Sequence, residues 1–216
     1  MLINLRGTSG SGKSTIIRQV MELYDTKNAV RLKGDERKQP IGYSLSKKMA
    51  KGNDKLLAVL GHYETNCGGC DTITSMDKIY EQVRAAADTS YDVLFEGLLL
   101  SAEVNRTLAL HTDGYPLLVI GLDTPLELCL SSVNGRRQGT FDKRLEAALA
   151  ENAARLERGL KTKPLPEPRG DVKPKNTESK YKATVSTMKR LADNGVATEW
   201  HDRDGALARI REVLGI

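Results

Sequence analysis

The chain has 216 residues, of which 39% are hydrophobic and 28% are charged, and these values are ordinary for a soluble globular protein. Three cysteines exclude a disulfide scaffold, and no apolar stretch approaches the roughly 20 residues of a membrane span or forms a signal peptide. We therefore expect a cytoplasmic protein with no membrane partner, whose net charge of +5 permits a polyanionic ligand without requiring one.

Strands and helices are expected to alternate along the chain. Short apolar runs predict strands over residues 1–5, 29–32, 56–60, 91–95, 117–122 and 196–200. Apolar residues that recur at helical spacing predict helices over residues 13–24, 75–87, 125–133, 141–160, 177–192 and 205–214. This alternation favours right-handed crossovers, and it predicts an α/β fold with a doubly wound parallel sheet.

The composition changes after Gly159. Residues 161–175 hold four of the seven prolines and cannot form one regular element. We interpret this segment as an excursion and not as a domain boundary. The expected organisation is a single domain over residues 1–216, with a helical lid at about 134–160 and a basic, proline-rich excursion at about 161–176.

The first predicted strand and helix are joined by a glycine-rich loop. Residues 7–14, Gly-Thr-Ser-Gly-Ser-Gly-Lys-Ser, match G-x-x-x-x-G-K-[ST] at every fixed position. Glycines let successive backbone N–H groups converge on an anion, and the helix N-terminus adds a partial positive charge. The alternative is a chance glycine turn, which the strand–loop–helix context disfavours.

The loop predicts nucleoside triphosphate binding, without saying what happens to the γ-phosphate. Lys13 would reach the β- and γ-phosphates, and the Ser14 hydroxyl would take one Mg²⁺ position. The expected contacts to the triphosphate are Gly7, Ser9, Gly10, Ser11, Gly12, Lys13, Ser14 and Thr15.

Other features narrow the class. The Asn-Lys-x-Asp motif with which GTPases read the base is absent from the sequence, and the chain is short for a mechanical ATPase. After the second predicted strand comes Lys-Gly-Asp-Glu-Arg, residues 33–37, and here the sequence resembles the small P-loop kinases, such as polynucleotide 5′-kinases and shikimate-type kinases. The resemblance implies that Asp35 accepts the proton of the acceptor hydroxyl. The alternative role for Asp35 is a helix N-cap.

Charged residues at two further positions suit a kinase. Glu96 ends the fourth predicted strand, where it resembles a Walker B residue and could hold an Mg²⁺-bound water; the alternative is a solvated strand-end carboxylate. Arg136 and Arg137, and more weakly Arg144, follow the helix that begins at Pro125, where these kinases carry their lid. Guanidinium groups there would neutralise charge on the transferred phosphoryl group. The alternative is a basic, solvated helix end.

The segment over residues 61–72 is rich in glycine and cysteine. His62, Cys67 and Cys70 suggest zinc, but a structural zinc site needs four ligands, and we expect no stable zinc site here. A loop at the carboxyl edge of the sheet that lines the acceptor pocket is the better interpretation. The residues expected to contact the acceptor are Arg37, His62, Tyr63, Asp71 and Thr72.

The acceptor is suggested by four short phrases: Leu-Phe-Glu-Gly-Leu-Leu at 94–99, Leu-Asp-Thr-Pro-Leu-Glu-Leu-Cys at 122–129, Arg-Arg at 136–137 and Lys-Asn-Thr-Glu-Ser-Lys at 175–180. They resemble the phage kinases that phosphorylate 5-hydroxymethyluracil in DNA. The resemblance implies ATP and Mg²⁺ as cofactors, DNA as acceptor and the host cytoplasm as location. Residues 161–190 are compatible with DNA, since they hold nine Lys and Arg against three Asp and Glu, although a solubilising loop is the alternative.

Two other functions stay open at this point. The first is a kinase of free nucleotides or of another small metabolite, for which DNA would be irrelevant. The second is an NTP-binding ATPase or switch that transfers no phosphate and responds to a protein partner.

Overall fold

The computed structural model describes residues 1–31, 38–65, 68–73, 75–89 and 91–216. Within these ranges the strands are β1 Leu2–Arg6, β2 Thr26–Val30, β3 Gly42–Lys47, β4 Lys55–Leu60, β5 Asp92–Glu96, β6 Leu117–Leu122 and β7 Ala197–His201. The α-helices are α1 Lys13–Glu22, α2 Met76–Asp88, α3 Asn105–Thr112, α4 Leu126–Glu157, α5 Pro174–Asp193 and α6 Arg203–Leu214. Two 3₁₀ turns are η1 Cys70–Thr72 and η2 Leu100–Ala102.

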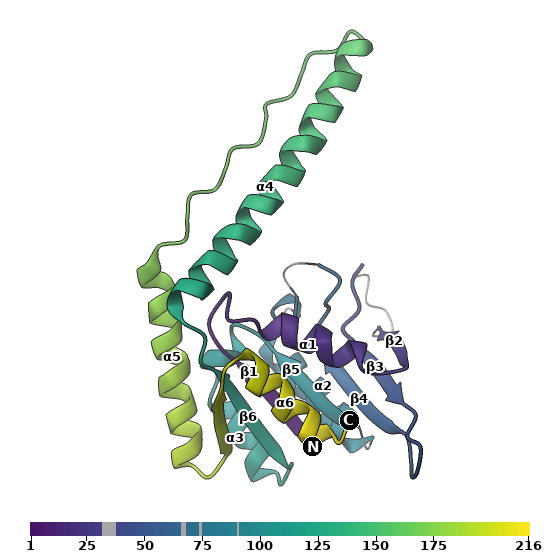
Figure 1. The fold of residues 1–216 in the computed structure, drawn as a ribbon, viewed down its shortest axis with the longest axis vertical. Coiled ribbons are helices and arrows are strands. Elements are labelled where there is room, and N and C mark those ends of the chain that lie inside the picture. The colour runs from purple at the N-terminus through teal and green to yellow at the C-terminus, as the bar shows by residue number, and fades with distance from the viewer. Residues whose placement is uncertain (32–37, 66–67, 74, 90) are drawn as a thin grey trace.

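The strands form one sheet in the order β2-β3-β4-β5-β1-β6-β7 (Figure 1). The run from β4 to β7 is parallel, which confirms most of the predicted sheet. The prediction of a wholly parallel sheet was wrong at one edge, where β2 and β3 are antiparallel. β3 was also missed, although Tyr43 and Leu45 are buried and alternate with less buried serines as in a half-buried strand.

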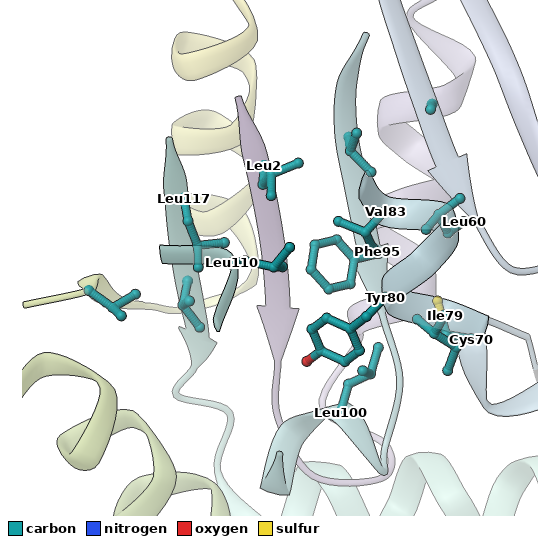
Figure 2. Close-up of a cluster of buried hydrophobic side chains, with 14 of the residues drawn as sticks. Leu2, Leu60, Cys70, Ile79, Tyr80, Val83, Phe95, Leu100, Leu110 and Leu117 are labelled. Atoms are coloured by element: carbon teal, nitrogen blue, oxygen red, sulfur yellow. The ribbon is translucent and has the colours of Figure 1, made fainter. Parts of the chain in front are cut away.

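The predicted α/β architecture is confirmed by helices packed on both faces of the sheet. Along β1, Leu2 faces α2, α3 and α5, whereas Ile3 and Leu5 face α1 and α6. Figure 2 shows the first of these two cores, in which Phe95 of β5 meets Tyr80 of α2 edge-on, with ring centroids 6.3 Å apart. Burial of β1 on both faces explains why Leu2, Ile3 and Leu5 are all apolar, and these residues made the strand visible in the sequence.

Helix α4 differs most from expectation. The sequence predicted two helices, over 125–133 and 141–160, but a single helix runs for 32 residues through Gly135 and Gly139. A helical glycine costs only about 1 kcal/mol relative to alanine, and the Ala-, Leu-, Glu- and Arg-rich residues that follow are strong helix formers. α4 is long yet rich in charge, and neither it nor any other helix of the described residues could cross a membrane. Helix α3 was missed, and α5 begins at Pro174, somewhat earlier than expected.

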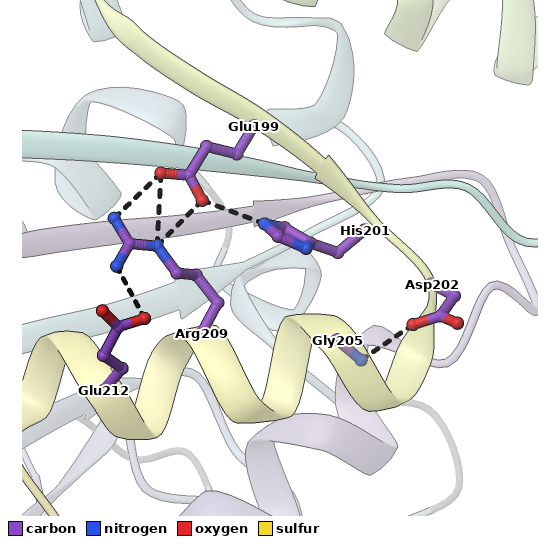
Figure 3. Close-up of polar contacts among 6 residues, drawn as sticks. All are labelled: Glu199, His201, Asp202, Gly205, Arg209 and Glu212. Atoms are coloured by element: carbon purple, nitrogen blue, oxygen red, sulfur yellow. Dashed lines mark hydrogen bonds and ion pairs between the residues drawn. The ribbon is translucent and has the colours of Figure 1, made fainter.

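The C-terminal helix α6 is fastened to the edge strand β7 by a polar cluster (Figure 3). Arg209 donates to both carboxylate oxygens of Glu199 at 2.9 Å and pairs with Glu212. The hydrogen bonds from Arg209 lower the pKa of Glu199. Asp202 caps the helix by accepting from the N–H of Gly205. This attachment fixes where α6 begins, and therefore where its first residue lies in the functional site.

A buried arginine ties β1 to the helices beneath the glycine-rich loop. The side chain of Arg6 is fully buried and donates to the Asn4 amide oxygen, the Glu103 carbonyl and the Thr107 hydroxyl at 2.6–2.7 Å. Burial lowers the pKa of Arg6 to about 10. The network is satisfied by three acceptors, which buried donors require.

Replacing Arg6 with alanine is expected to lower the free energy of unfolding by about 2–4 kcal/mol, because the substitution leaves a cavity and strips buried acceptors of their donors. Urea denaturation monitored by circular dichroism measures this change. Arg84→Ala is the control: Arg84 forms a partly exposed ion pair with Asp113, and its loss should cost less than about 1 kcal/mol. Equal effects of the two substitutions would contradict the role given to Arg6.

Candidate active site

The glycine-rich loop, residues 7–14, connects the carboxyl end of β1 to the first turn of α1. Gly10 and Gly12 have φ angles of 83° and 106°, which favour glycine over residues with a Cβ. A Cβ on Gly10 would lie 2.2 Å from the Cys129 carbonyl oxygen, and one on Gly12 would lie 2.7 Å from Nε of Arg203. The loop therefore needs glycine at both positions for its conformation and for its close packing.

Ser14 and Glu96, the two residues that we expected from the sequence to hold Mg²⁺, are in contact at this loop. The hydroxyl of Ser14, in the first turn of α1, donates to Oε1 of Glu96 at 2.7 Å, and Glu96 ends the adjacent strand β5. Carboxylate and hydroxyl oxygens are ligands that Mg²⁺ accepts. The pair therefore fits a magnesium site.

Lys13 lies beside this pair in a buried position. Its ammonium group donates to the carbonyl oxygens of Gly7 at 2.7 Å and Thr8 at 3.1 Å. Burial lowers the pKa of Lys13 and raises that of Glu96, and in each case the opposite charge of the other residue offsets part of the shift. The two charges sit where water screens them poorly, which strengthens their attraction for a bound anion and cation.

A cleft of about 500 Å³ opens in front of these groups. The predicted site residues that line it are Ser9, Gly10, Gly12, Lys13, Ser14, Thr15, Asp71, Glu96 and Arg136. Gly7 and Ser11 lie behind the lining. The N–H of Gly7 donates to the hydroxyl of Ser101, and the carbonyl of Ser11 accepts from Thr124. Both residues thus support the loop from below.

The two neighbouring arginines of α4 point to different partners. Arg136 lines the cleft together with Ser132, one helical turn earlier. Arg137 instead donates to the carbonyl oxygen of Gly170 at 2.7 Å, in the segment that follows α4. Arg144, the weaker candidate, lies two turns farther along the helix and is exposed. The structure therefore brings one of the three predicted arginines to the cleft.

The glycine- and cysteine-rich segment forms one wall of the cleft. Asp71 accepts from the N–H groups of Leu98 at 2.7 Å and Leu99 at 3.1 Å, which ties the segment to the end of β5. Gly69 packs on the carboxylate of Glu96, where an added Cβ would lie 2.4 Å from Oε1. Burial raises the pKa of the Cys70 thiol well above its usual value, so this cysteine is a protonated core residue.

The other expected acceptor contacts are placed differently. His62 and Tyr63 are each 5% exposed, and the Tyr63 hydroxyl donates to the Leu60 carbonyl within the core. The hydroxyl of Thr72 donates to the carbonyl of Gly69. None of these three lines the described cleft. Asp35, Arg37 and Cys67 lie outside the described residues.

Two arginines that the sequence analysis missed complete the lining. Arg18 of α1 donates to the carbonyls of Tyr63 at 3.0 Å and Thr65 at 2.6 Å, and so anchors the glycine- and cysteine-rich segment. It lies one turn after Ser14, a spacing that could have indicated its place beside the loop. Arg203, the first residue of α6, donates to the carbonyls of Ser11 and Gly10 at 2.9 Å. No local pattern links Arg203 to a loop at the other end of the chain.

Comparison with known proteins gives a consistent set of relatives. Residues 2–159 match the family model described as 5-hmdU DNA kinase. A 5-hmdU DNA kinase of Pseudomonas phage PaMx11 is 49% identical over 214 residues, which are 99% of this chain and 96% of that protein. A 5-hmdU DNA kinase of Pseudomonas phage M6 is 27% identical over 145 residues, 63% of this chain and 72% of that protein. One of Delftia phage PhiW-14 is 40% identical over 72 residues, 33% of this chain and 22% of that protein. No solved structure matches the chain.

Proposed function

The chain belongs to the 5-hmdU DNA kinase family, and on this premise we propose that it transfers the γ-phosphate of ATP to the hydroxymethyl group of 5-hydroxymethyluracil in DNA. The observation that carries the chemistry is the meeting of Lys13, Ser14 and Glu96 at the head of one cleft, with Arg136 at its side. Phosphoryl transfer needs such positioned charges more than it needs covalent chemistry.

We assign the glycine-rich loop to the phosphates of ATP, as in P-loop enzymes. Ser9, Gly10 and Gly12 of the loop line the cleft together with the first turn of α1, and the Lys13 ammonium can exchange its carbonyl partners for phosphate oxygens. Ser14 and Glu96 would hold Mg²⁺, which when bound neutralises charge on the phosphates. Arg203 keeps the loop in shape by holding two of its carbonyls.

In the transfer itself, the acceptor oxygen attacks the γ-phosphorus as the bond to the β-phosphate oxygen breaks, and ADP leaves. The hydroxyl proton has to be accepted, and we assign this role to Asp35 on the resemblance described above. Asp71 borders the cleft, but its carboxylate is engaged with two backbone N–H groups. We therefore propose that Asp71 shapes the wall of the site and accepts no proton. A base within duplex DNA must leave the helical stack to reach such a cleft.

Arg136 is expected to stabilise the charge that develops on the transferred phosphoryl group. Arg136→Ala should reduce kcat by about 100-fold, the scale seen when one preorganised donor is removed from a transition state. Arg137→Ala is the matched control, because the neighbouring guanidinium contacts Gly170 outside the cleft lining, and it should leave kcat nearly unchanged. Steady-state rates with saturating ATP measure both. A larger loss for Arg137→Ala than for Arg136→Ala would reverse the assignment.

The proposed function is tested by identifying the product. DNA that contains 5-hydroxymethyluracil is incubated with the protein, ATP and Mg²⁺, digested by a nuclease to 5′-mononucleotides without phosphatase, and analysed by mass spectrometry. We expect the modified mononucleotide to gain one phosphoryl group, and chelation of Mg²⁺ by EDTA to prevent the gain. Phosphate found only at DNA 5′ ends would mean a polynucleotide end kinase instead.

A further inference from the structure

The second part of α4 leaves the body of the protein. Residues 134–173, here called the arm, comprise α4 from Asn134 onward and an extended segment, 158–173, that runs back along the helix to α5 (Figure 1). All forty arm residues are described, and Asn152 alone among them is buried. The arm therefore does not exist to complete the hydrophobic core.

The two halves of the arm are nevertheless held together by specific hydrogen bonds. Hydrogen bonds between side chains of its helix and backbone groups of the returning segment join the two halves. The amide of Asn152 pairs with both the N–H and the carbonyl of Lys163, at 2.7 and 2.9 Å. Further bonds along the arm join Asn134 to Val172, Arg137 to Gly170 and Arg155 to Lys161. These contacts hold the two halves side by side from the root of the arm, at Asn134 and Val172, to its tip, at Arg155 and Lys161.

The geometry of the two halves explains why the register holds. From Arg137 to Asn152 the helix advances 15 residues, or about 22 Å at 1.5 Å per residue. From Lys163 to Gly170 the segment advances seven residues, or about 22 Å at 3.1 Å per extended residue. Pro164, Pro166 and Pro168 favour this extended conformation. The lengths match, so the hydrogen bonds at Arg137 and at Asn152 can form together.

Most of the net positive charge of the protein is on the arm. The arm holds ten Lys and Arg against six Asp and Glu, so it carries +4 of the net +5 in fewer than a fifth of the residues. The charge is densest at the tip, where residues 155–163 include four basic side chains and one acidic one. Leu156 and Leu160, 63% and 49% exposed, flank these basic residues. An exposed surface of this kind complements a polyanion, and apolar side chains beside basic ones also suit a nucleic-acid groove.

We propose that the arm binds the DNA duplex that carries the target base, and that its tip contacts phosphates about one helical turn from that base. This inference rests on the proposed function. The root of the arm lies at the cleft, where Arg136 lines it. The 24 helical residues from Asn134 to Glu157 span about 36 Å, and one turn of B-DNA spans about 34–36 Å. The arm is therefore long enough to reach the next turn of a duplex held at the cleft.

Charge reversal at the tip tests the proposal. In Arg158→Glu/Lys161→Glu, two exposed side chains change sign while the hydrogen bonds between the halves of the arm are kept. The matched control is Lys48→Glu/Lys51→Glu, which changes the net charge equally in the exposed turn between β3 and β4, away from the arm (Figure 1). Binding to DNA is measured by fluorescence anisotropy without ATP, over a range of salt concentrations. The two probes are a duplex of about three helical turns and a hairpin duplex of about one turn, each with a central 5-hydroxymethyluracil.

The wild-type protein is expected to bind the long duplex at least about tenfold more tightly than the short one, because the tip contributes phosphate contacts. The arm variant should lose this difference, and the slope of log affinity against log salt should fall by about 2, while the control variant resembles wild type. Unchanged binding and salt slope in the arm variant would overturn the inference, even where the kinase is active. Arm-dependent DNA binding by a wild-type protein that transfers no phosphate to this DNA would overturn the proposed function instead.

Discussion

Lys13→Met is expected to reduce phosphotransfer by about three orders of magnitude, because it removes the buried cation that we assign to the β- and γ-phosphates. The methionine side chain is of similar length and can occupy the same buried space. The loss should therefore appear in kcat and in ATP affinity while the fold, measured by circular dichroism, persists. Transfer of label from γ-labelled ATP gives the rate.

The matched control for this substitution is Lys78→Met, which removes an exposed lysine from the surface of α2 and should leave the rate unchanged. Activity of Lys13→Met within tenfold of wild type would mean that residues 7–14 do not act as the phosphate-binding loop. A loss of similar size in Lys78→Met would show that charge anywhere on the protein matters, which the geometry of the cleft does not predict.

Asp35→Asn is expected to lower kcat by about 100- to 10,000-fold with little change in the KM for ATP. The amide keeps the shape of the side chain but cannot take the proton from the hydroxyl group of the acceptor. Initial rates of label transfer from γ-labelled ATP, measured over a range of ATP concentrations, give both constants.

Glu36→Gln is the control for the proton acceptor, because it neutralises the adjacent carboxylate. It should retain most of the activity. Transfer that survives Asp35→Asn nearly unchanged would contradict the assignment of the base. Asp71, the carboxylate that the structure places on the cleft, would then be the next residue to substitute.

The centre of the fold could be predicted from the sequence because its signals are local. β1 is a short, mostly apolar segment buried on both faces, and the glycine-rich loop follows it with fixed spacing before the amphipathic α1. Glu96 could be placed near the loop because parallel strands end at the same edge of a sheet. The glycine-rich motif had indicated Ser14 and the end of a predicted strand had indicated Glu96, and the structure brings these two side chains into contact.

The parts that escaped prediction depend on tertiary contacts. β2 exposes all five of its residues, so the strand predicted over 29–32 overlaps it only at Ala29 and Val30. The antiparallel pairing of β2 with β3 was not predicted, because it comes from backbone hydrogen bonds. The continuity of α4 through Gly135 and Gly139 depends on a balance of small helix propensities. Arg203 reaches the loop because α6 is clamped onto β7, at the other end of the chain.

The unusual composition of the arm could be recognised in the sequence, but its structure could not. The basic, proline-rich composition of residues 161–176 was visible, and so was the possibility of a lid before it. The composition could not reveal that Asn152 and Asn134 would bond the backbone of the returning segment and hold it along one long helix. Pairings between side chains and distant backbone groups leave no periodic trace in a sequence.

The most direct test of the account is transfer from γ-labelled ATP to four acceptors in parallel: DNA containing 5-hydroxymethyluracil, unmodified DNA of the same sequence, a mixture of deoxynucleoside monophosphates, and no acceptor. We predict label on the DNA that contains 5-hydroxymethyluracil and on nothing else, with the label lost in Lys13→Met. Label on the monophosphates in place of the modified DNA, or phosphate release in every tube without a labelled acceptor, would contradict the proposed function.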